Sequence, residues 1–451
     1  MDKKEQILYG LFPIDGENYT FLLQDFYFHI MSSSKKYISE TIKADENGLL
    51  HATTYDGHPI AVYSTKKELP IYEHLKLKTD NYMLHEFNQF PPEYKETYLF
   101  DGIEFVGGSL SKVFFPSSLN IVSENGKSLL DKNDDTISFS FKSKEIFYTV
   151  SAFSSPDTTV SISGTTVSNA NTHLLLKFDT PQTVGEIFSC YNNIRTILSF
   201  MTFRTTISFE TVGLLQHLKD NDSDCRVTWR LYVDTIPDEN KKDNYNCITF
   251  EDLGESATNL FQMVFSATES KVNYSLGFIP SDDKHCGRFN NDRIKTICSA
   301  MECEATFCHI PKSEETLEIE KLAKEIKTLI ELHRSRENSL SSKSYDKIFG
   351  NIRHWGLASS DQIIYLYNIH RETLINVLVP FSITEKDISD FVKFRNDITH
   401  GRTRIINQNI AAAELMFGFA DYSGAVPVGN KHHFKKIMGV RFFAPTSMLV
   451  K

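Results

Sequence analysis

The chain has 451 residues, 41% hydrophobic and 24% charged, with a formal net charge of −10; because single cores seldom exceed roughly 250–300 residues, we expect two or three domains. It contains neither the roughly 20 consecutive apolar residues of a membrane span nor the apolar segment of a signal peptide, so we expect a cytoplasmic protein without a membrane partner. The seven cysteines are odd in number and scattered, which argues against a secreted disulfide framework.

The first 180 residues have the pattern of β-strands joined by tight turns. Five dipeptides combine a residue that tolerates positive φ with a glycine, as tight turns require: Asp15-Gly16, Asn47-Gly48, Asp56-Gly57, Asp101-Gly102 and Asn125-Gly126. Ile137, Phe139 and Phe141 alternate with polar residues, and residues 173–179 are a second candidate strand. The small, polar residues 154–171 fit a long hairpin or a loop. We predict a twisted sheet or a β-sandwich for this region.

Residues 181–290 mix helix and strand patterns, and we expect a continuation of the β-rich region or a bridge to the next domain. Pro181 and Thr183 open a predicted helix. Its apolar face repeats at helical spacing and contains Val184, Ile187, Phe188, Tyr191, Ile194 and Met201. Residues 205–209 are predicted to return to a strand.

Residues 291–451 have a helical pattern. We predict helices over residues 291–308, from Ser313, from Ser359 or Ser360 to Pro380, and from Thr384, where Asp387 completes a capping box. The second helix has an apolar stripe that contains Ile319, Leu322, Ala323, Ile326, Leu329, Ile330 and His333. The expected fold class is therefore α+β, with a β-rich, sandwich-like N-terminal region followed by an all-α bundle.

Positive charge is concentrated in the helical part. From residue 291 onward, 22 Lys and Arg stand against 19 Asp and Glu, whereas the first 290 residues carry 26 against 39. Nine of the fourteen arginines follow residue 290, and none precedes Arg195. Because arginine suits bidentate contact with phosphate, we expect any phosphate chemistry in the C-terminal third.

An arginine interrupts the apolar stripe of the helix that begins at Thr384. Arg395 follows Ile388 by seven residues and occupies a position where the spacing predicts a core residue. An unpartnered buried guanidinium is costly, so this face must meet an acidic partner, a phosphate or a polar cleft at an interface. His400 follows, and Gly401 predicts that the helix ends there, where its dipole favours a protonated imidazole.

Arg395 and His400 together suit the cleavage of RNA, whose ribose 2′-OH is its own nucleophile. A histidine acts as base or acid near neutral pH, and an arginine stabilises the charge that develops on phosphorus, so no metal is required. The spacing by itself is also satisfied by a plainer arrangement, in which the arginine pairs with a buried acid and the histidine lies on the surface.

Residues 394–401, with the sequence FRNDITHG, resemble the motif of the HEPN superfamily, whose ribonucleases carry an Arg, a polar residue, three further residues and a His. The resemblance extends to the helical pattern of residues 291–451, and ICSAME at residues 297–302 resembles the first HEPN helix, which often bears a Glu. A β-rich region joined to such a module resembles the ApeA-type anti-phage proteins of bacteria.

This resemblance implies a metal-independent endoribonuclease with RNA as substrate, no cofactor, and an active site shared by a homodimer of the HEPN domain. It also implies a toxin-like role in abortive infection with a phage-derived trigger. The implied catalytic residues are Arg395, His400 and Asn396, with Glu302 and Asp397 in support. A non-catalytic HEPN module for dimerisation or RNA binding is the alternative. Nucleotide transfer to a partner protein is a third option, although no nucleotide site is recognisable.

Three other features have plainer interpretations. Lys431, Lys435 and Lys436 form a small basic patch that suits either an RNA backbone or a solvated helix face. Four cysteines between residues 286 and 308 lack the close spacing of structural zinc ligands, so we expect ordinary thiols and no metal. Gly107-Gly108 lacks the rest of a phosphate-binding loop and is expected to be a turn.

Overall fold

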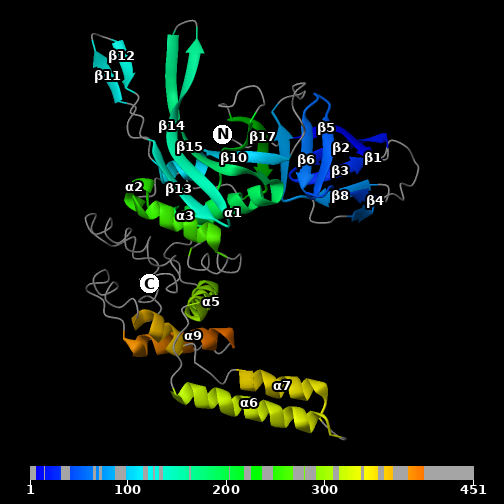
Figure 1. Ribbon diagram of the computed structural model, residues 1–451, viewed down its shortest axis with the longest axis vertical. Coiled ribbons are helices and arrows are strands. Elements are labelled where there is room, and N and C mark those ends of the chain that lie inside the picture. Colours follow the sequence, from blue (N-terminus) through cyan, green and yellow to red (C-terminus); the bar gives the residue numbers. More distant parts are fainter. Residues whose placement is uncertain are drawn as a thin grey trace. The chain divides into compact units, whose positions relative to one another are not determined.

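The chain divides into two compact units, Met1–Ala267 and Thr268–Lys451. The first is β-rich and the second helical (Figure 1), which confirms the expected order of the two kinds of structure. None of the described helices is both long and apolar enough to cross a membrane. The structure is a computed structural model that describes residues 7–14, 16–31, 41–63, 68–70, 74–86, 98–114, 120–124, 127–131, 136–161, 164–202, 204–217, 225–235, 247–267, 279, 291–307, 314–336, 340–353, 360–368 and 384–400.

The first unit is built on one large antiparallel sheet. Among the described residues it has thirteen strands, in the order β13-β14-β15-β10-β16-β17-β9-β6-β5-β1-β2-β3-β8. These strands are β1 (Leu8–Ile14), β2 (Glu17–Gln24), β3 (Tyr27–Met31), β5 (Leu49–Thr54), β6 (Pro59–Tyr63), β8 (His74–Lys78), β9 (Asn81–His85), β10 (Leu99–Val106), β13 (Ile137–Ser143), β14 (Ile146–Ser161), β15 (Gly164–Thr183), β16 (Thr211–His217) and β17 (Cys225–Val233). Two smaller pairs join β4 (Thr41–Lys43) to β7 (Glu68–Pro70) and β11 (Asn120–Glu124) to β12 (Lys127–Asp131).

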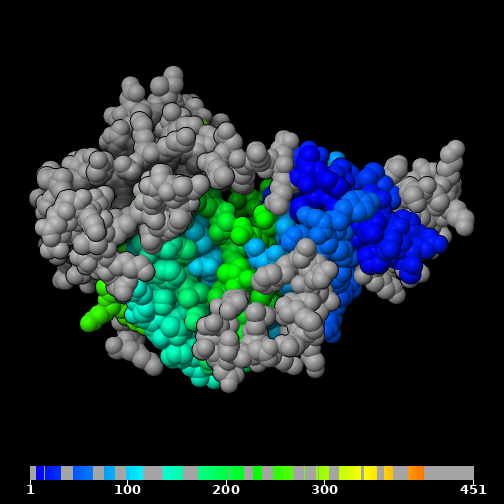
Figure 2. Space-filling view, turned by 90° about the horizontal axis from the view of Figure 1, so that it is seen from above, coloured from blue at the N-terminus to red at the C-terminus, as the bar shows by residue number. Residues whose placement is uncertain are grey.

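The structure differs from the predicted fold in one respect: the β-rich unit is not a sandwich. A sandwich has two packed sheets, whereas here β17 and β9 join the early and late strands by continuous hydrogen bonding. Figure 2 shows the early strands, in blue, adjoining the cyan and green of the later ones. Inward-facing side chains of β1, β2 and β3 nevertheless gather into one core, in which the ring centroid of Phe28 lies 5.7 Å from that of Phe12 and 5.2 Å from that of Phe21.

Local patterns predicted several elements of this unit correctly. Asn47-Gly48 and Asp56-Gly57 form turns in which the glycine φ is 76° and 93°. The alternation in β13 and the hairpin of β14 and β15 are also confirmed.

Two predictions for this unit are wrong. Gly102 was expected in a turn but lies inside β10. A Cβ at this position would be 2.8 Å from the Leu176 carbonyl oxygen, so the absence of a side chain lets β10 approach β15 closely. Residues 205–209 have no strand pairing and precede β16.

Helices cover the buried face of the late strands (Figure 1). The predicted helix is α1 (Val184–Thr202), although Pro181 and Thr183, which were expected to open it, belong to the end of β15. Helix α1 contacts β10 and β15, while α3 (Ser256–Ser266) contacts β13. The short α2 (Phe250–Leu253) precedes α3, and the 3-10 helix η1 (Gly108–Lys112) follows β10. Residues 181–267 thus contribute α1, β16, β17, α2 and α3 to the same unit as the early strands.

Gly108 is expected to tolerate no side chain. Its φ is +63°, and a Cβ there would lie 2.3 Å from the Ser208 carbonyl oxygen. Gly108→Ala should therefore lower the free energy of unfolding by more than about 2 kcal/mol, measured by urea denaturation. Gly185→Ala is the matched control: it adds the same methyl group to α1, where nothing lies within 4 Å, and should stabilise by about 0.5–1 kcal/mol. Equal effects of the two changes would contradict this.

The second unit contains the four predicted helices, which are α5 (Asn291–Phe307), α6 (Glu314–Arg334), a helix over residues 360–368 and α9 (Glu385–Thr399). A further helix, α7 (Ser342–Arg353), was not predicted. One apolar cluster joins α5, residues 360–368 and α9, and it consists of Ile294, Ile297, Cys298, Met301, Ile363, Tyr367, Ile388, Phe391, Val392, Phe394 and Ile398. The predicted start at Ser313, the stop at Pro380 and Gly401 lie outside the described residues.

The predicted stripe of α6 is not a single buried face. Leu322 and Leu329 are 50% and 64% exposed, and Ala323 is the buried residue of this helix among those described. His333 faces α7, where its Nδ1 lies 2.7 Å from the Tyr345 hydroxyl. Among the described residues α7 packs against α6, and several residues of the stripe stay exposed, so helical periodicity identified the helix but overestimated its burial.

The capping box of α9 is confirmed. Thr384 Oγ1 accepts from the Asp387 N–H at 3.3 Å, and Asp387 Oδ2 accepts from the Thr384 N–H at 2.8 Å. Thr384→Ala should cost about 1 kcal/mol because it leaves an N-terminal N–H without its acceptor. Ser389→Ala, which removes an exposed hydroxyl from the same helix, should have a much smaller effect. Thermal unfolding of both variants measures the difference, and equal losses would exclude a capping role.

Candidate functional site

Arg395 lies at the junction of α9 and α5. Its side chain is 19% exposed, and its Nη2 donates to Oε1 of Glu302 on α5 at 2.6 Å, where the two charges form an ion pair. The apolar cluster between the two helices sets this approach, since α9 presents Phe391 and Phe394 to the core that α5 also enters. The arginine on the apolar stripe therefore has an acidic partner within its own chain.

The other residues of the predicted site gather at the same end of α9. Arg395 Nη1 donates to Asn396 Oδ1 at 2.9 Å, and Thr399 Oγ1 donates to the Arg395 carbonyl oxygen at 2.9 Å. His400 is the C-cap; its side chain is exposed and its backbone N–H donates to the Asn396 carbonyl oxygen at 3.0 Å. Asp397 lies half-buried on α9. Arg395, Asn396 and Glu302 are thus in contact, with His400 exposed at the helix end.

Among the described residues, the guanidinium of Arg395 has hydrogen-bond partners for some of its N–H donors but not for all of them. Arginine has five N–H donors, and the contacts with Glu302 and Asn396 engage two of them. Glu302 and Asn396 hold the planar guanidinium in a defined orientation, so a phosphate ligand would not need to orient it on binding. The geometry therefore suits an arginine that is prepositioned at a partly exposed surface, and it also suits a purely structural ion pair.

The cysteines near this site are ordinary thiols. Burial raises the pKa of Cys298, which packs close to Arg395 and Glu302, to about 12, so the group is a protonated thiol near neutral pH. Burial and the nearby Glu302 also raise the pKa of the exposed Cys303. In the part of the chain that the structure describes, no His, Cys, Asp and Glu side chains cluster as metal ligands do. Cys286 and Cys308 lie outside that part, as do Lys431, Lys435 and Lys436.

Thiol alkylation checks this assignment. In the native protein iodoacetamide should modify Cys303 slowly and leave Cys298 unmodified, because the thiolate is the nucleophile and Cys298 is also inaccessible. Peptide mass spectrometry before and after denaturation reads out both sites. Rapid native modification of Cys298 would contradict the packing of α5 against α9.

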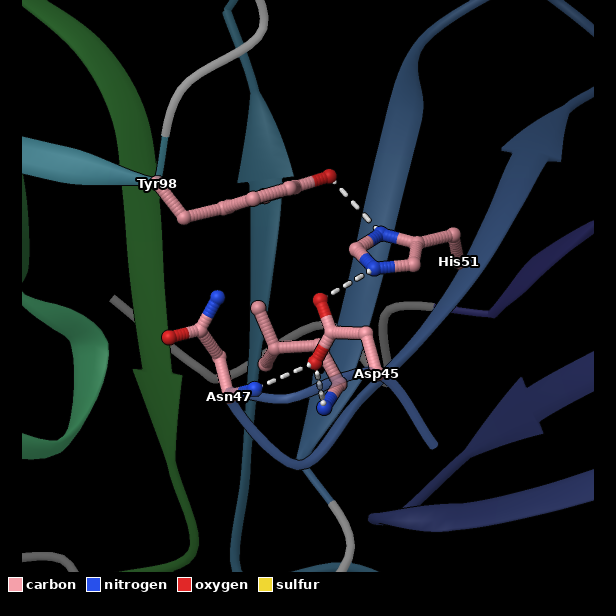
Figure 3. Close-up of polar contacts among 5 residues, drawn as sticks. Asp45, Asn47, His51 and Tyr98 are labelled. Carbon is pink, nitrogen blue, oxygen red and sulfur yellow. Dashed lines mark hydrogen bonds and ion pairs between the residues drawn. The ribbon is translucent and has the colours of Figure 1, made fainter. Parts of the chain in front are cut away.

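The β-rich unit contains a hydrogen-bonded chain that sequence reasoning missed (Figure 3). Oδ1 of Asp45 accepts the N–H groups of Asn47 and Leu49, each at 2.8 Å, and its Oδ2 lies 2.8 Å from His51 Nε2. Since a carboxylate only accepts, Nε2 carries a proton, and in the neutral imidazole Nδ1 accepts from the Tyr98 hydroxyl at 2.7 Å. These hydrogen bonds link Tyr98, which precedes β10, to Asp45 in the turn before β5. Their role is structural.

The same unit has an aromatic cavity of about 270 Å³. It lies between the β2–β3 turn, β17 and the segment before β16, and its aromatic lining consists of Phe26, Tyr82, Tyr191, Phe209 and Tyr232. Tyr82 and Tyr232 stack with ring centroids 4.7 Å apart, while Asp25, Glu210 and Arg230 add charged groups. Stacked aromatic rings and three charged groups thus line this cavity of the β-rich unit.

Comparisons of the chain with protein-family models, with curated proteins and with solved structures found no match. Membership of residues 291–451 in the HEPN superfamily therefore stays a prediction from the residues that carry the motif. The fold and the site define a coarser class: a two-unit α+β protein with a partly buried Arg–Glu pair and an exposed histidine at one helix end.

Proposed function

We propose that this protein is a HEPN-type endoribonuclease of bacterial antiviral defence that cleaves RNA without a metal ion or another cofactor. The observation that carries the proposal is the position of Arg395. Glu302 and Asn396 hold its guanidinium near the C-terminal end of α9, where His400 is exposed to solvent. A cation and an imidazole are thus available at the same end of one helix.

The proposed reaction uses the substrate's own 2′-OH. This oxygen attacks the adjacent phosphorus, the bond to the 5′ oxygen breaks, and the products carry a 2′,3′-cyclic phosphate and a 5′-OH. His400 transfers a proton to or from the reacting oxygens, and Arg395 stabilises the added negative charge on the phosphoryl oxygens. Asn396 and Glu302 orient the guanidinium through the contacts described above.

The proposal extends to assembly and biological role. Residues 291–451 form a homodimer in which two Arg395/His400 pairs face one cleft, and the enzyme acts in the cytoplasm as a toxin-like factor of abortive infection. The first 290 residues carry 39 Asp and Glu against 26 Lys and Arg. That negative charge repels RNA, so this region restrains the nuclease until a phage-derived trigger is sensed.

One observation favours a second candidate function. Because Glu302 already partners Arg395, no phosphate is needed to explain an arginine beside an apolar core. The helical unit would then be a non-catalytic HEPN module for dimerisation or RNA binding.

End analysis of cleaved RNA separates the two. Full-length protein is incubated with total bacterial RNA and excess chelator, with and without an extract of phage-infected cells. The proposal predicts fragments with 2′,3′-cyclic phosphate ends. Cleavage that the chelator abolishes would contradict it, and RNA binding without cleavage under either condition would favour the non-catalytic module.

A further inference from the structure

A second histidine network lies on the face of the large sheet opposite the core. Ser155 on β14, His173 on β15 and Glu104 on β10 come from three adjacent strands. His173 Nδ1 lies 2.9 Å from Glu104 Oε1, and its Nε2 lies 2.5 Å from Ser155 Oγ. Because the carboxylate only accepts, Nδ1 donates to it, and in the neutral imidazole Nε2 then accepts the proton of Ser155.

The neighbours of this network complete a reactive arrangement. The Phe153 ring stacks on the imidazole of His173 with centroids 4.9 Å apart and an interplanar angle of 3°, which fixes the ring's orientation. Asn171 is the register partner of Ser155, so their side chains share one face with Cβ atoms about 4.5–5.5 Å apart. An amide at that distance can donate to an oxyanion that forms at Ser155.

A structural role accounts for this network less well. Two other contacts between strands on the same face are pairs of hydroxyl groups, Ser138 with Ser151 and Ser140 with Thr149, and these suffice to link strands. The side chains of His173 and Glu104 are only 15% and 22% exposed, so burying an imidazole and a carboxylate here costs desolvation that the sheet does not require. Serine acyl-transfer sites on unrelated folds share three parts: a nucleophile, a base that is hydrogen-bonded to it, and an acid that orients the base.

We propose that Ser155, His173 and Glu104 form a nucleophilic site that hydrolyses acyl esters or thioesters. Ser155 Oγ bonds to the carbonyl carbon as its proton passes to His173 Nε2, and Asn171 donates to the oxyanion. The carbonyl re-forms as the C–O or C–S bond to the leaving group breaks, and that group takes the proton from His173 and departs as the alcohol or thiol. Water then adds to the acyl-serine by the same steps, which releases the acid and restores Ser155. Glu104 is a positioning residue that holds the tautomer of His173.

This site is independent of the proposed ribonuclease, and a fluorophosphonate probe tests it directly. Ser155 Oγ would displace fluoride from the probe's phosphorus, so the folded full-length protein should gain one adduct, which peptide mass spectrometry locates on Ser155. His400→Ala should label at the wild-type rate, which keeps the two proposals separable. Absence of an adduct on Ser155 in the folded wild type overturns the inference.

Variants test the role of each partner. His173→Gln should slow labelling by a factor of about 100 or more, and Ser151→Ala, which removes another hydroxyl from β14, should leave the rate unchanged. Glu104→Asp should label faster than Glu104→Gln because it keeps the carboxylate, whereas a merely structural role would favour the isosteric glutamine. Circular dichroism checks that each variant is folded. Equal rates in wild type and His173→Gln would overturn the proposal, whatever the other variants do.

Discussion

His400→Ala is expected to lower the rate of RNA cleavage by a factor of about 10² to 10⁴, the usual contribution of a general acid or base. His400 is an exposed C-cap whose backbone N–H, not its side chain, makes the capping bond. The change should therefore leave the free energy of unfolding within about 0.5 kcal/mol of wild type. Cleavage of a fluorescent RNA in chelator measures the first effect, and urea denaturation measures the second.

Two further variants make this result specific. Lys393→Ala removes an exposed side chain from the same helix and should leave the cleavage rate unchanged. Arg395→Lys keeps a positive charge but loses the planar group that contacts Glu302 and Asn396 together, so cleavage should fall strongly. If His400→Ala cleaves as fast as Lys393→Ala, the imidazole does not take part in the reaction and the non-catalytic module is the better explanation.

Phe391→Ala is expected to destabilise the helical unit by about 3–5 kcal/mol, the usual cost of deleting a fully buried aromatic side chain. Phe391 is 1% exposed and lies in the cluster that joins α9 to α5 and residues 360–368. Its loss opens a cavity at the junction that brings Arg395 to Glu302, so cleavage should fall with stability. Urea denaturation followed by circular dichroism is the measurement, and the transition of the helical unit is the one that shifts.

Lys393→Ala is again the matched control, because it shortens a side chain of the same helix without touching the core. Its free energy of unfolding should stay within about 0.5 kcal/mol of wild type. A cost below about 1 kcal/mol for Phe391→Ala would mean that this cluster does not hold the unit together. The orientation of Arg395 by Glu302 would then lose its structural basis.

Elements with a strong local period were predictable from the sequence. The spacing of Val184, Ile187 and Ile194 identified α1, and Thr384 with Asp387 identified the start of α9 to the residue. In both cases the signal lies within a few residues, because side-chain spacing and capping bonds are local. The same reasoning failed at Gly102, since a glycine in a turn and a glycine beneath a neighbouring strand look alike in one sequence.

Contacts between distant residues could not be derived from spacing. Glu302 and Arg395 are 93 residues apart, and only the resemblance to HEPN proteins suggested that they meet. Nothing in the sequence suggested the chain from Asp45 to Tyr98 or the network of Ser155, His173 and Glu104. Strand register brings the network of Ser155, His173 and Glu104 together, because it decides which side chains of neighbouring strands are opposed.

The sequence by itself determined the division of the chain, with a β-rich acidic part first and a helical, arginine-bearing part after it, because composition and periodicity are properties of short segments. Only the tertiary structure decided that the strands form one large continuous sheet, that Arg395 is paired within its own chain, and that much of α6 stays exposed. These outcomes depend on which surfaces pack together. Packing depends on contacts between segments that are distant in the sequence, so the pattern of a single segment does not determine it.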